Sequence, residues 1–195
     1  MSADMMAGAT PRQLSAGRRV LDLGCGPNKQ AGAIGADRNP ISQADVLCDL
    51  DSFPYPFRAD SFDEIRLSHV IEHLRDVVAL TAEVWRIGRH GARVFIATPH
   101  FSSIHSYTDP GHRQRLARGS FDQVRKDLPP GVRIEVVRKE IEFHRRSFWS
   151  WPARLIYRLS PNKYEKFFAF LFPARELVFE LRVVKDAGRG TRAEG

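Results

Sequence analysis

The stretch Val-Leu-Asp-Leu-Gly-Cys-Gly at residues 20–26 constrains the fold more than any other part of this 195-residue chain. Three apolar residues around one acid are typical of a short strand that is buried on both faces. Gly24 and Gly26 then predict a tight turn that brings bare backbone close to whatever lies above the strand end. In open α/β sheets, ligands bind outside the carboxyl ends of the strands. Glycine pairs also mark ordinary turns, so whether this turn binds a ligand has to be inferred from the other motifs of the chain.

Strand-like runs alternate with loops and helices along the chain, as a wound α/β domain requires. Strands are expected at 19–23, 33–36, 45–48, 62–67, 93–98, 132–141 and 177–184, and helices at 77–87 and 121–126. Only ten residues separate Gly26 from Asp37, and they include Pro27, Gly32 and Gly35. These residues disfavour a helix, so the first crossover is expected to be a loop or a single turn.

The chain is expected to form one domain at 18–185, between a disordered tail at 1–17 and a C-terminal tail at 186–195. The first residues have no apolar core, so they are not typical of a secretory signal. Cys25 and Cys48 are then expected to be free thiols, since two cysteines without an export signal rarely form a disulfide. The predicted compartment is the cytoplasm.

A helical insertion is expected at 145–173, between the sixth and seventh strands. Apolar residues recur there at helical spacing: Phe148, Trp151, Leu155, Ile156 and Leu159 on a first helix, and Tyr164, Phe167, Phe168, Leu171 and Phe172 on one side of a second. The two helices would pack as a lid on the domain, cover a substrate, or face a membrane. Aromatic residues beside Arg154 and Arg158 suit an interface, which keeps peripheral contact with the inner membrane face open.

The positive charge of the chain lies in its second half. Residues 111–195 carry 19 Lys and Arg against 10 Asp and Glu, whereas residues 1–110 carry 11 against 13. This asymmetry indicates an acidic partner or serves solubility, and it does not choose between nucleic acid, anionic lipid and a phosphorylated small molecule. No run approaches the roughly 18 apolar residues that span a bilayer.

Further short motifs follow the opening strand in a fixed order. They are Ile34-Gly-Ala-Asp37, Cys48-Asp49-Leu50, Phe53-Pro-Tyr-Pro-Phe57, Ser61-Phe-Asp63, Ser68-His-Val-Ile-Glu-His-Leu74, Glu83-Val-Trp-Arg86 and Gly91-Ala-Arg-Val-Phe-Ile96. Over about residues 18–100 the chain thus resembles the class I S-adenosylmethionine-dependent methyltransferases, in particular the group that includes the ubiquinone and menaquinone methyltransferases. The resemblance implies a Rossmann-like α/β fold with a mostly parallel seven-stranded sheet, the last strand antiparallel, and S-adenosyl-L-methionine as cofactor.

The resemblance also implies which residues bind the cofactor. They are Asp22, Gly24, Cys25, Gly26, Asp37, Asp49, Leu50 and Ser68. The glycine turn would approach the methionine part with bare backbone. Asp22 would reach the cofactor's amino group or merely cap the turn. Asp37 would accept both ribose hydroxyls, as the acid of a dinucleotide fold does, and Asp49 with the backbone of Leu50 would meet the adenine.

Three histidines, His69, His73 and His100, are the candidate catalytic residues. His69 is expected at the reactive end of the cofactor and His73 near the acceptor, and a histidine can take the proton of a hydroxyl. His69 and His73 also match the H-x-x-E-H pattern of zinc proteases, but His69 ends a strand, which disfavours that class. Glu72 is expected to be solvated or to cap a turn.

The polar segment 98–112 is expected to form an acceptor pocket, a metal site or a plain polar loop. No metal is assigned to the chain; if one binds, His100, Asp109 and His112 are the expected ligands, for Mg²⁺ or Zn²⁺.

The expected reaction is methyl transfer to a small-molecule, glycan or lipid acceptor, with O-methylation as first choice because a histidine-rich loop suits deprotonation of a hydroxyl. C-methylation of a membrane quinone-like ring and a non-catalytic cofactor-binding protein are the alternatives. Nucleic acid is not the expected partner, since residues 68–71 read Ser-His-Val-Ile where base-amine methyltransferases carry Asn/Asp-Pro-Pro-Tyr/Phe.

Overall fold

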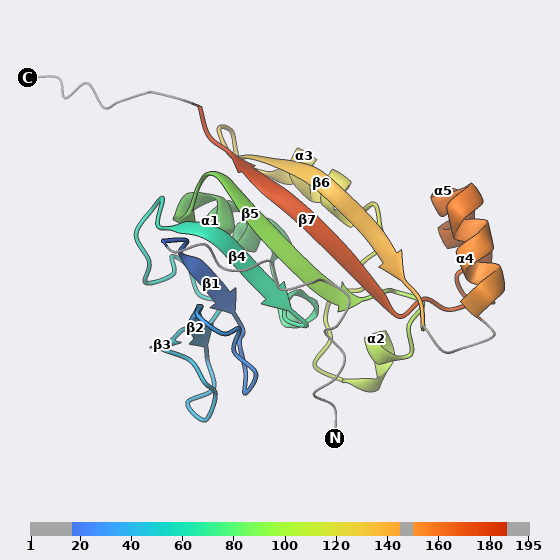
Figure 1. Cartoon of the computed structure of the whole chain (residues 1–195), viewed down its shortest axis with the longest axis horizontal. Helices are drawn as coiled ribbons and strands as arrows, with labels where there is room; N and C mark the ends of the chain where they lie inside the picture. The colour runs from blue at the N-terminus through green and yellow to red at the C-terminus, as the bar shows by residue number, and fades with distance from the viewer. Residues whose placement is uncertain (1–16, 145–149, 187–195) are drawn as a thin grey trace, which may run out of the picture.

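The computed structural model describes residues 17–144 and 150–186, and one seven-stranded sheet forms its centre (Figure 1). The strands are β1 (Val20–Leu23), β2 (Ile34–Asp37), β3 (Val46–Leu47), β4 (Phe62–Ser68), β5 (Gly88–Pro99), β6 (Arg133–Glu142) and β7 (Glu176–Val184). The helices are α1 (Val77–Ile87), α2 (His105–Thr108), α3 (Ser120–Asp127), α4 (Ser150–Leu159), α5 (Pro161–Lys163), the 3₁₀ turn η1 (Ile71–His73) and the π-helical turn η2 (Tyr164–Phe168). The predicted tails, apart from Gly17 and Asp186, lie outside the described residues.

The strand order is β3-β2-β1-β4-β5-β7-β6. β3, β2, β1, β4 and β5 are parallel to one another, and β7 is antiparallel to both β5 and β6. The predicted Rossmann-like sheet with an antiparallel last strand is therefore confirmed. Because β2 lies on one side of β1 and β4 on the other, the order reverses at β1, and the glycine turn after β1 lies at this switch point.

The first crossover contains no helix, as predicted, and lies directly on β2. A Cβ atom on Gly35 would lie 2.6 Å from Lys29 Cδ and 2.8 Å from Cys25 Sγ, so only glycine leaves room for this loop. The backbone N–H of Gln30 donates to Asp22 Oδ2 at 2.8 Å and holds the loop to the end of β1. The loop thus packs directly on β2 at Gly35 and takes the place of the helix that usually covers this strand.

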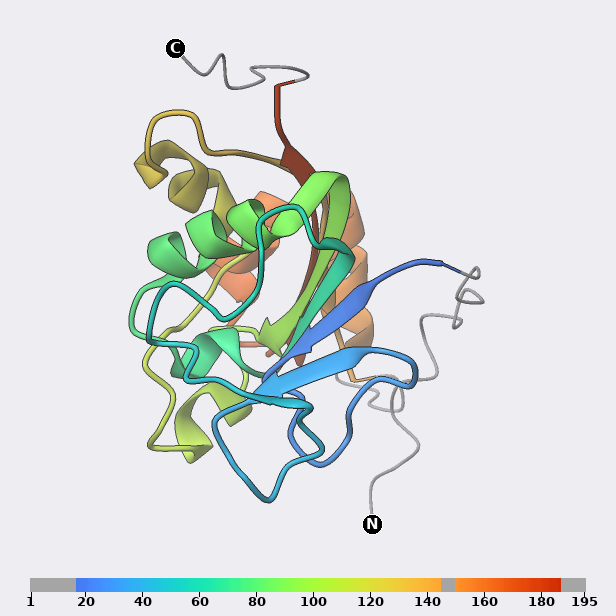
Figure 2. The same cartoon turned by 90° about the vertical axis from the view of Figure 1, so that its left-hand side faces the viewer.

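Helix α1 has the bounds that its sequence predicts. It begins after Asp76, whose side chain accepts from Ala79 N at 2.8 Å as an N-cap, and it ends at Gly88. Leu80 and Ile87 on its inner face are buried, and each such side chain contributes about 1.5–3 kcal/mol to stability. α1 and α3 cover the same face of the sheet (Figure 2).

Helices α4 and α5 and the turn η2 lie in the predicted insertion between β6 and β7. The apolar residues that the sequence places on one side of the second helix differ in burial. Tyr164 is fully buried and Phe168 and Phe172 are half-buried, but Phe167 is 64% and Leu171 69% exposed. The π-helical turn widens the spacing, which rotates the later positions away from the face that α-helical periodicity assigns to them. No described helix has the length and apolar composition to cross a membrane.

Candidate functional site

The glycine turn after β1 combines one tightly packed glycine with one that borders open space. Gly24 and Gly26 have φ of +69° and +52°, a region that favours glycine. The backbone N–H of Gly24 donates to Ala36 O at 2.7 Å, which ties the turn to β2. A Cβ on Gly24 would lie 2.3 Å from Val70 Cγ2, whereas a Cβ on Gly26 would meet nothing within 4 Å. The turn therefore offers bare backbone to a ligand above Gly26.

Asp37 stands at the carboxyl end of β2, beside this turn. Its Oδ2 accepts from Gly26 N at 2.9 Å and its Oδ1 from Asn39 N at 2.8 Å. An ionised carboxylate has about four acceptor sites, so two remain for ligand hydroxyls. The open space at Gly26 and the spare acceptor sites of Asp37 fit a ribose-containing cofactor, and ribose binding by Asp37 stays a prediction.

Asp22 and Cys25 are buried beneath the turn. Burial raises the pKa of Asp22, and its carboxyl group accepts from Gln30 N, which is the turn-capping role. A contact of Asp22 with the cofactor's amino group stays a prediction. Burial also raises the pKa of the Cys25 thiol, so this thiol is protonated at neutral pH and provides no reactive thiolate. Cys25 and Cys48 are both free thiols, as expected.

Asp49 and Leu50 follow β3 in a turn that their own side chains and backbone stabilise. Asp49 Oδ1 accepts from Asp51 N at 3.1 Å and its Oδ2 from Ser52 Oγ at 3.2 Å. The side chain of Leu50 is buried, and its carbonyl accepts from Tyr55 Oη at 2.8 Å. Asp49 is exposed and lines a polar cavity of about 230 Å³, so it is accessible to a ligand. Adenine binding here stays a prediction.

His69 follows Ser68, the half-buried last residue of β4, and has a backbone φ of +55°, which is rare for a residue with a side chain. Its Nε2 lies 3.3 Å from Glu176 Oε1 and its Nδ1 3.4 Å from Glu72 Oε1. These carboxylates, Glu176 foremost, raise the pKa of His69 to about 9. At neutral pH the ring is therefore an imidazolium, and it would have to lose a proton before it could act as a general base.

Glu72 is not solvated, contrary to the expectation from sequence. The residue is 2% exposed, and its Oε2 accepts from Thr98 Oγ1 at 2.9 Å. His73 lies on the one-turn helix η1, and its ring meets that of His112 edge-to-face with centroids 4.6 Å apart. Since His69 is directed to Glu176 instead, the two histidines of H-x-x-E-H do not share a helix face.

His100 has no exposed surface. Its Nδ1 lies 2.8 Å from Ser102 Oγ and its Nε2 3.2 Å from Glu165 Oε1, so the ring joins the end of β5 to the insertion. Both ring nitrogens thus face protein groups, and a catalytic role of His100 stays a prediction. Within residues 17–144 and 150–186, the expected metal ligands His100, Asp109 and His112 do not form one cluster.

Sequence reasoning missed Glu176, the strongest partner of His69. It lies more than a hundred residues from His69 and is the first residue of β7, where the antiparallel pairing with β5 places it opposite Pro99. In the sequence around Glu176, the only sign of this role is that a carboxylate stands at the start of the last strand.

Comparisons with known proteins agree with this geometry. Residues 31–96 match the Methyltransf_11 family model, described as a methyltransferase domain. No protein of curated function matches the sequence.

Solved structures share the fold. The YcgJ protein of Bacillus subtilis is 15% identical, with a TM-score of 0.58 over 87% of this chain and 93% of that one. A S-adenosylmethionine-dependent methyltransferase of Archaeoglobus fulgidus is 20% identical, with a TM-score of 0.53 over 85% and 86%. The phosphoethanolamine N-methyltransferase 2 of Haemonchus contortus is 17% identical, with a TM-score of 0.57 over 87% of this chain and 49% of that longer one. At these identities the likeness concerns the fold.

Proposed function

We propose that this chain is a class I S-adenosylmethionine-dependent methyltransferase, as its match to the methyltransferase domain model over residues 31–96 suggests, and that it methylates an oxygen atom of an amphiphilic small molecule. The cofactor, when bound, supplies an activated methyl group. The task left to the chain is to hold the acceptor atom in line with that group, which is a large source of rate enhancement in such displacements. Membership of the ubiquinone and menaquinone group stays a prediction.

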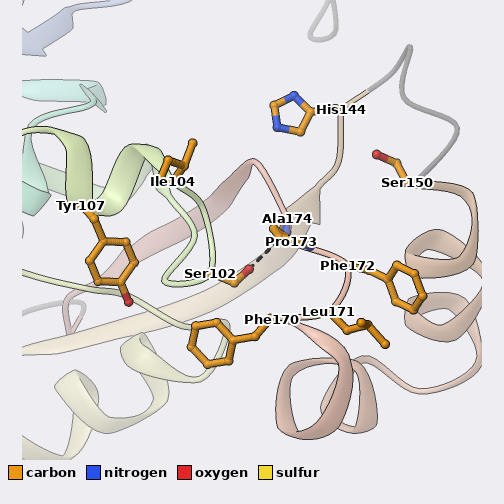
Figure 3. Close-up of a pocket in the computed structure, with 10 residues that line it drawn as sticks. All are labelled: Ser102, Ile104, Tyr107, His144, Ser150, Phe170, Leu171, Phe172, Pro173 and Ala174. Carbon is orange, nitrogen blue, oxygen red and sulfur yellow. Dashed lines mark hydrogen bonds between the residues drawn. The ribbon is translucent and has the colours of Figure 1, made fainter.

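The observation that carries the proposal is an apolar cavity of about 660 Å³ between the insertion and the segment after β5 (Figure 3). Ile104 and Tyr107 line one side of it, and Phe170, Leu171 and Phe172 line the other. Its volume lies in the range of small-molecule pockets, which are mostly apolar with a few polar groups. A sugar would lose its hydration against these walls without gaining hydrogen bonds, so the cavity favours an acceptor with an apolar body.

The cavity borders the segment that leads to Glu176, the carboxylate partner of His69. Ala174 lines the cavity, and two residues further along Glu176 contacts His69. An acceptor in the cavity would then place its polar end toward a positively charged ring. A neighbouring cation lowers the pKa of a hydroxyl. Both nitrogens of His69 face carboxylates, so we propose that the ring exchanges one of these partners for an acidic acceptor hydroxyl and favours its ionised form. This role supports O-methylation and does not require His69 to act as a neutral base.

The outer surface of the insertion supports acceptor delivery from a membrane. Six large apolar side chains there are 47–79% exposed: Trp151, Leu155, Leu159, Phe167, Phe170 and Leu171. The same segment carries Arg154, Arg158, Lys163 and Lys166 against the single acid Glu165. Exposed apolar and basic residues together are typical of segments that bind anionic membrane surfaces. Phe170 and Leu171 also line the cavity, so the two features are continuous.

C-methylation of a quinone-like ring is the second candidate, because such a ring also fits apolar walls. The two differ in the product. A methyl group on oxygen adds an ether or ester, whereas a methyl group on carbon leaves every hydroxyl of the acceptor free.

A labelled-methyl screen tests the proposal. The protein is incubated with a trideuteromethyl donor and with separate lipid and glycan extracts, and labelled products are identified by mass spectrometry. We expect label in the lipid extract, on oxygen. Phe172→Ala, inside the cavity, should lower product formation, whereas Val137→Ser, an equally apolar but exposed site on β6, should not.

Label found only in the glycan extract would refute the amphiphilic acceptor. Label on carbon would select the quinone-like alternative. Retained cofactor binding without labelled product in either extract would favour the non-catalytic alternative.

A further inference from the structure

We propose that Glu72, His73 and His112 form a binding site for a divalent transition-metal ion, and that Zn²⁺ fits the ligand set best. One donor atom from each residue lies within 4.8 Å of the other two. Two imidazoles and one carboxylate are a set that binds Zn²⁺ in enzymes, with a further position left for water or substrate. The proposal does not depend on the identity of the methyl acceptor.

Two polar atoms of these three residues are buried and have no hydrogen-bond partner among the described residues. They are Glu72 Oε1 and His112 Nδ1. Glu72 is 2% exposed, and the side chain of His112 is 8% exposed. A buried polar atom without a partner costs about 1–3 kcal/mol, and a charged one costs more. A cation between the two residues would satisfy both atoms at once.

The remaining polar atoms of both ligands already face orienting groups. Glu72 Oε2 accepts from Thr98 Oγ1 at 2.9 Å, which leaves Oε1, 3.4 Å from His69 Nδ1, as the oxygen without a hydrogen bond. His112 Nε2 lies 4.0 Å from Asp109 Oδ2, which leaves Nδ1 as the free nitrogen. Metal-binding histidines commonly direct their second nitrogen to a carboxylate in this way. Thr98 and Asp109 are therefore positioning residues for the proposed site.

Main-chain hydrogen bonds hold the two ligand-bearing segments together. The backbone N–H groups of Arg113 and Gln114 both donate to Glu72 O, at 2.7 and 3.0 Å. The side-chain amide of Gln114 donates to Leu74 O at 3.1 Å. The backbone that carries all three ligands is thus fixed without a metal, so an ion would have to reorient only side chains.

The remaining adjustment is small. Donor atoms on a tetrahedral Zn²⁺ lie about 3.3–3.5 Å apart, since Zn–N and Zn–O bonds are about 2.0–2.2 Å long. A contraction of up to about 1.5 Å from 4.8 Å satisfies this geometry, and rotation of the His73 and His112 rings can supply it. A Cβ on Gly111 would lie 3.3 Å from His73 Nδ1, so the 109–112 turn lies against this ring. His73 and Gly111 also line the polar cavity of about 230 Å³, which gives an ion a route from solvent.

His69 offers a competing explanation for the buried carboxylate, because its charged ring lies 3.4 Å from Glu72 Oε1. This ion pair accounts for the charge of Glu72. It does not account for the unpartnered Nδ1 of His112 or for the convergence of His73 on the same point. The metal accounts for all three.

Metal titration of the tag-free, metal-stripped full chain tests the proposal. We expect one Zn²⁺ per chain, a rise in the midpoint of thermal unfolding, and a visible absorption band with Co²⁺ that lacks thiolate charge transfer. Glu72→Gln and His112→Gln should each weaken Zn²⁺ binding by more than about 100-fold, since loss of a positioning residue alone costs about 10–100-fold. Asp109→Asn should fall within that smaller range. His105→Gln, an exposed histidine of α2, is the matched control and should bind as the wild type does.

Absence of stoichiometric Zn²⁺ and Co²⁺ binding by the folded wild type would overturn the proposal and leave the ion pair with His69 as the explanation. Unchanged affinity in Glu72→Gln would overturn it as well, as would a preference for Mg²⁺ over Zn²⁺. If His112→Gln does not fold, the wild-type Co²⁺ spectrum and Glu72→Gln decide the question.

Discussion

Alanine at Gly24 and alanine at Gly26 should have different consequences, although both residues belong to one turn. Each has a positive φ, so alanine costs about 1–2 kcal/mol at either position for backbone conformation alone. The atoms around the two glycines then make the further cost of alanine different at the two positions. A Cβ on Gly24 would lie 2.3 and 2.9 Å from the two Cγ atoms of Val70, whereas a Cβ on Gly26 would enter open space.

The magnitudes follow from these contacts. Overpacking of this kind costs about 1–3 kcal/mol, so Gly24→Ala should lower the free energy of unfolding by about 2–5 kcal/mol in total. For a domain of this size that is a fall of about 4–20 °C in Tm. Gly26→Ala should cost only about 1–2 kcal/mol. Its methyl group would occupy the space that we assign to the cofactor, so cofactor affinity should fall at least about tenfold, which is 1.4 kcal/mol.

Two measurements check this pair. Thermal unfolding gives Tm for each variant, and calorimetric titration with S-adenosylhomocysteine gives the affinity of the folded protein. Val70→Ala provides an internal control, because removal of both Cγ atoms relieves the clash and leaves Val70 Cβ, at 3.2 Å, as the nearest atom. Gly24→Ala combined with Val70→Ala should therefore be more stable than the sum of the two single effects predicts.

Two results would refute the reasoning. Wild-type cofactor affinity in Gly26→Ala would mean that the open space above the turn is not the cofactor site. Equal losses of stability in Gly24→Ala and Gly26→Ala would mean that the contact with Val70 does not limit this position.

Three further predictions concern carboxylates. Asp37→Asn should weaken S-adenosylhomocysteine binding by about 10–100-fold in a titration, because one acceptor for ribose hydroxyls is lost, whereas Asp45→Asn, directly before β3, should not. Glu83→Ala should lower the free energy of unfolding by about 2–3 kcal/mol, since its 7% exposed side chain accepts from a backbone N–H and an arginine. Burial raises the pKa of Glu165, but hydrogen bonds from His100 and a backbone N–H outweigh it and lower the pKa below 4.5. Glu165→Gln should therefore lower Tm at neutral pH, and the difference from wild type should shrink as pH falls below 4.5 toward the folded-state pKa.

The elements that the sequence predicted well are those whose signals are local. Helix α1 has an N-cap at Asp76, an apolar face at helical spacing and Gly88 at its end, so all three signals agree. The absence of a first helix was equally predictable, because one proline and two glycines within ten residues disfavour a helix. The insertion shows the limit of this reasoning. Its helices follow from periodicity, but a π-helical turn at residues 164–168 changes the phase, and periodicity alone does not reveal where a phase changes.

The chemistry of the site depends on contacts that no local pattern contains. Glu72 reads as a surface residue because glutamate is rarely buried, yet Thr98 and the 109–114 segment, distant in sequence, enclose it. From its polar segment in the sequence, His100 is expected to be an accessible ligand, yet Glu165 approaches it from the insertion. In both cases the deciding partner comes from another element at the carboxyl edge of the sheet. Residue types therefore indicate which chemistry is available in this chain, and long-range contacts between elements, such as Glu165 with His100, determine which residues can perform it.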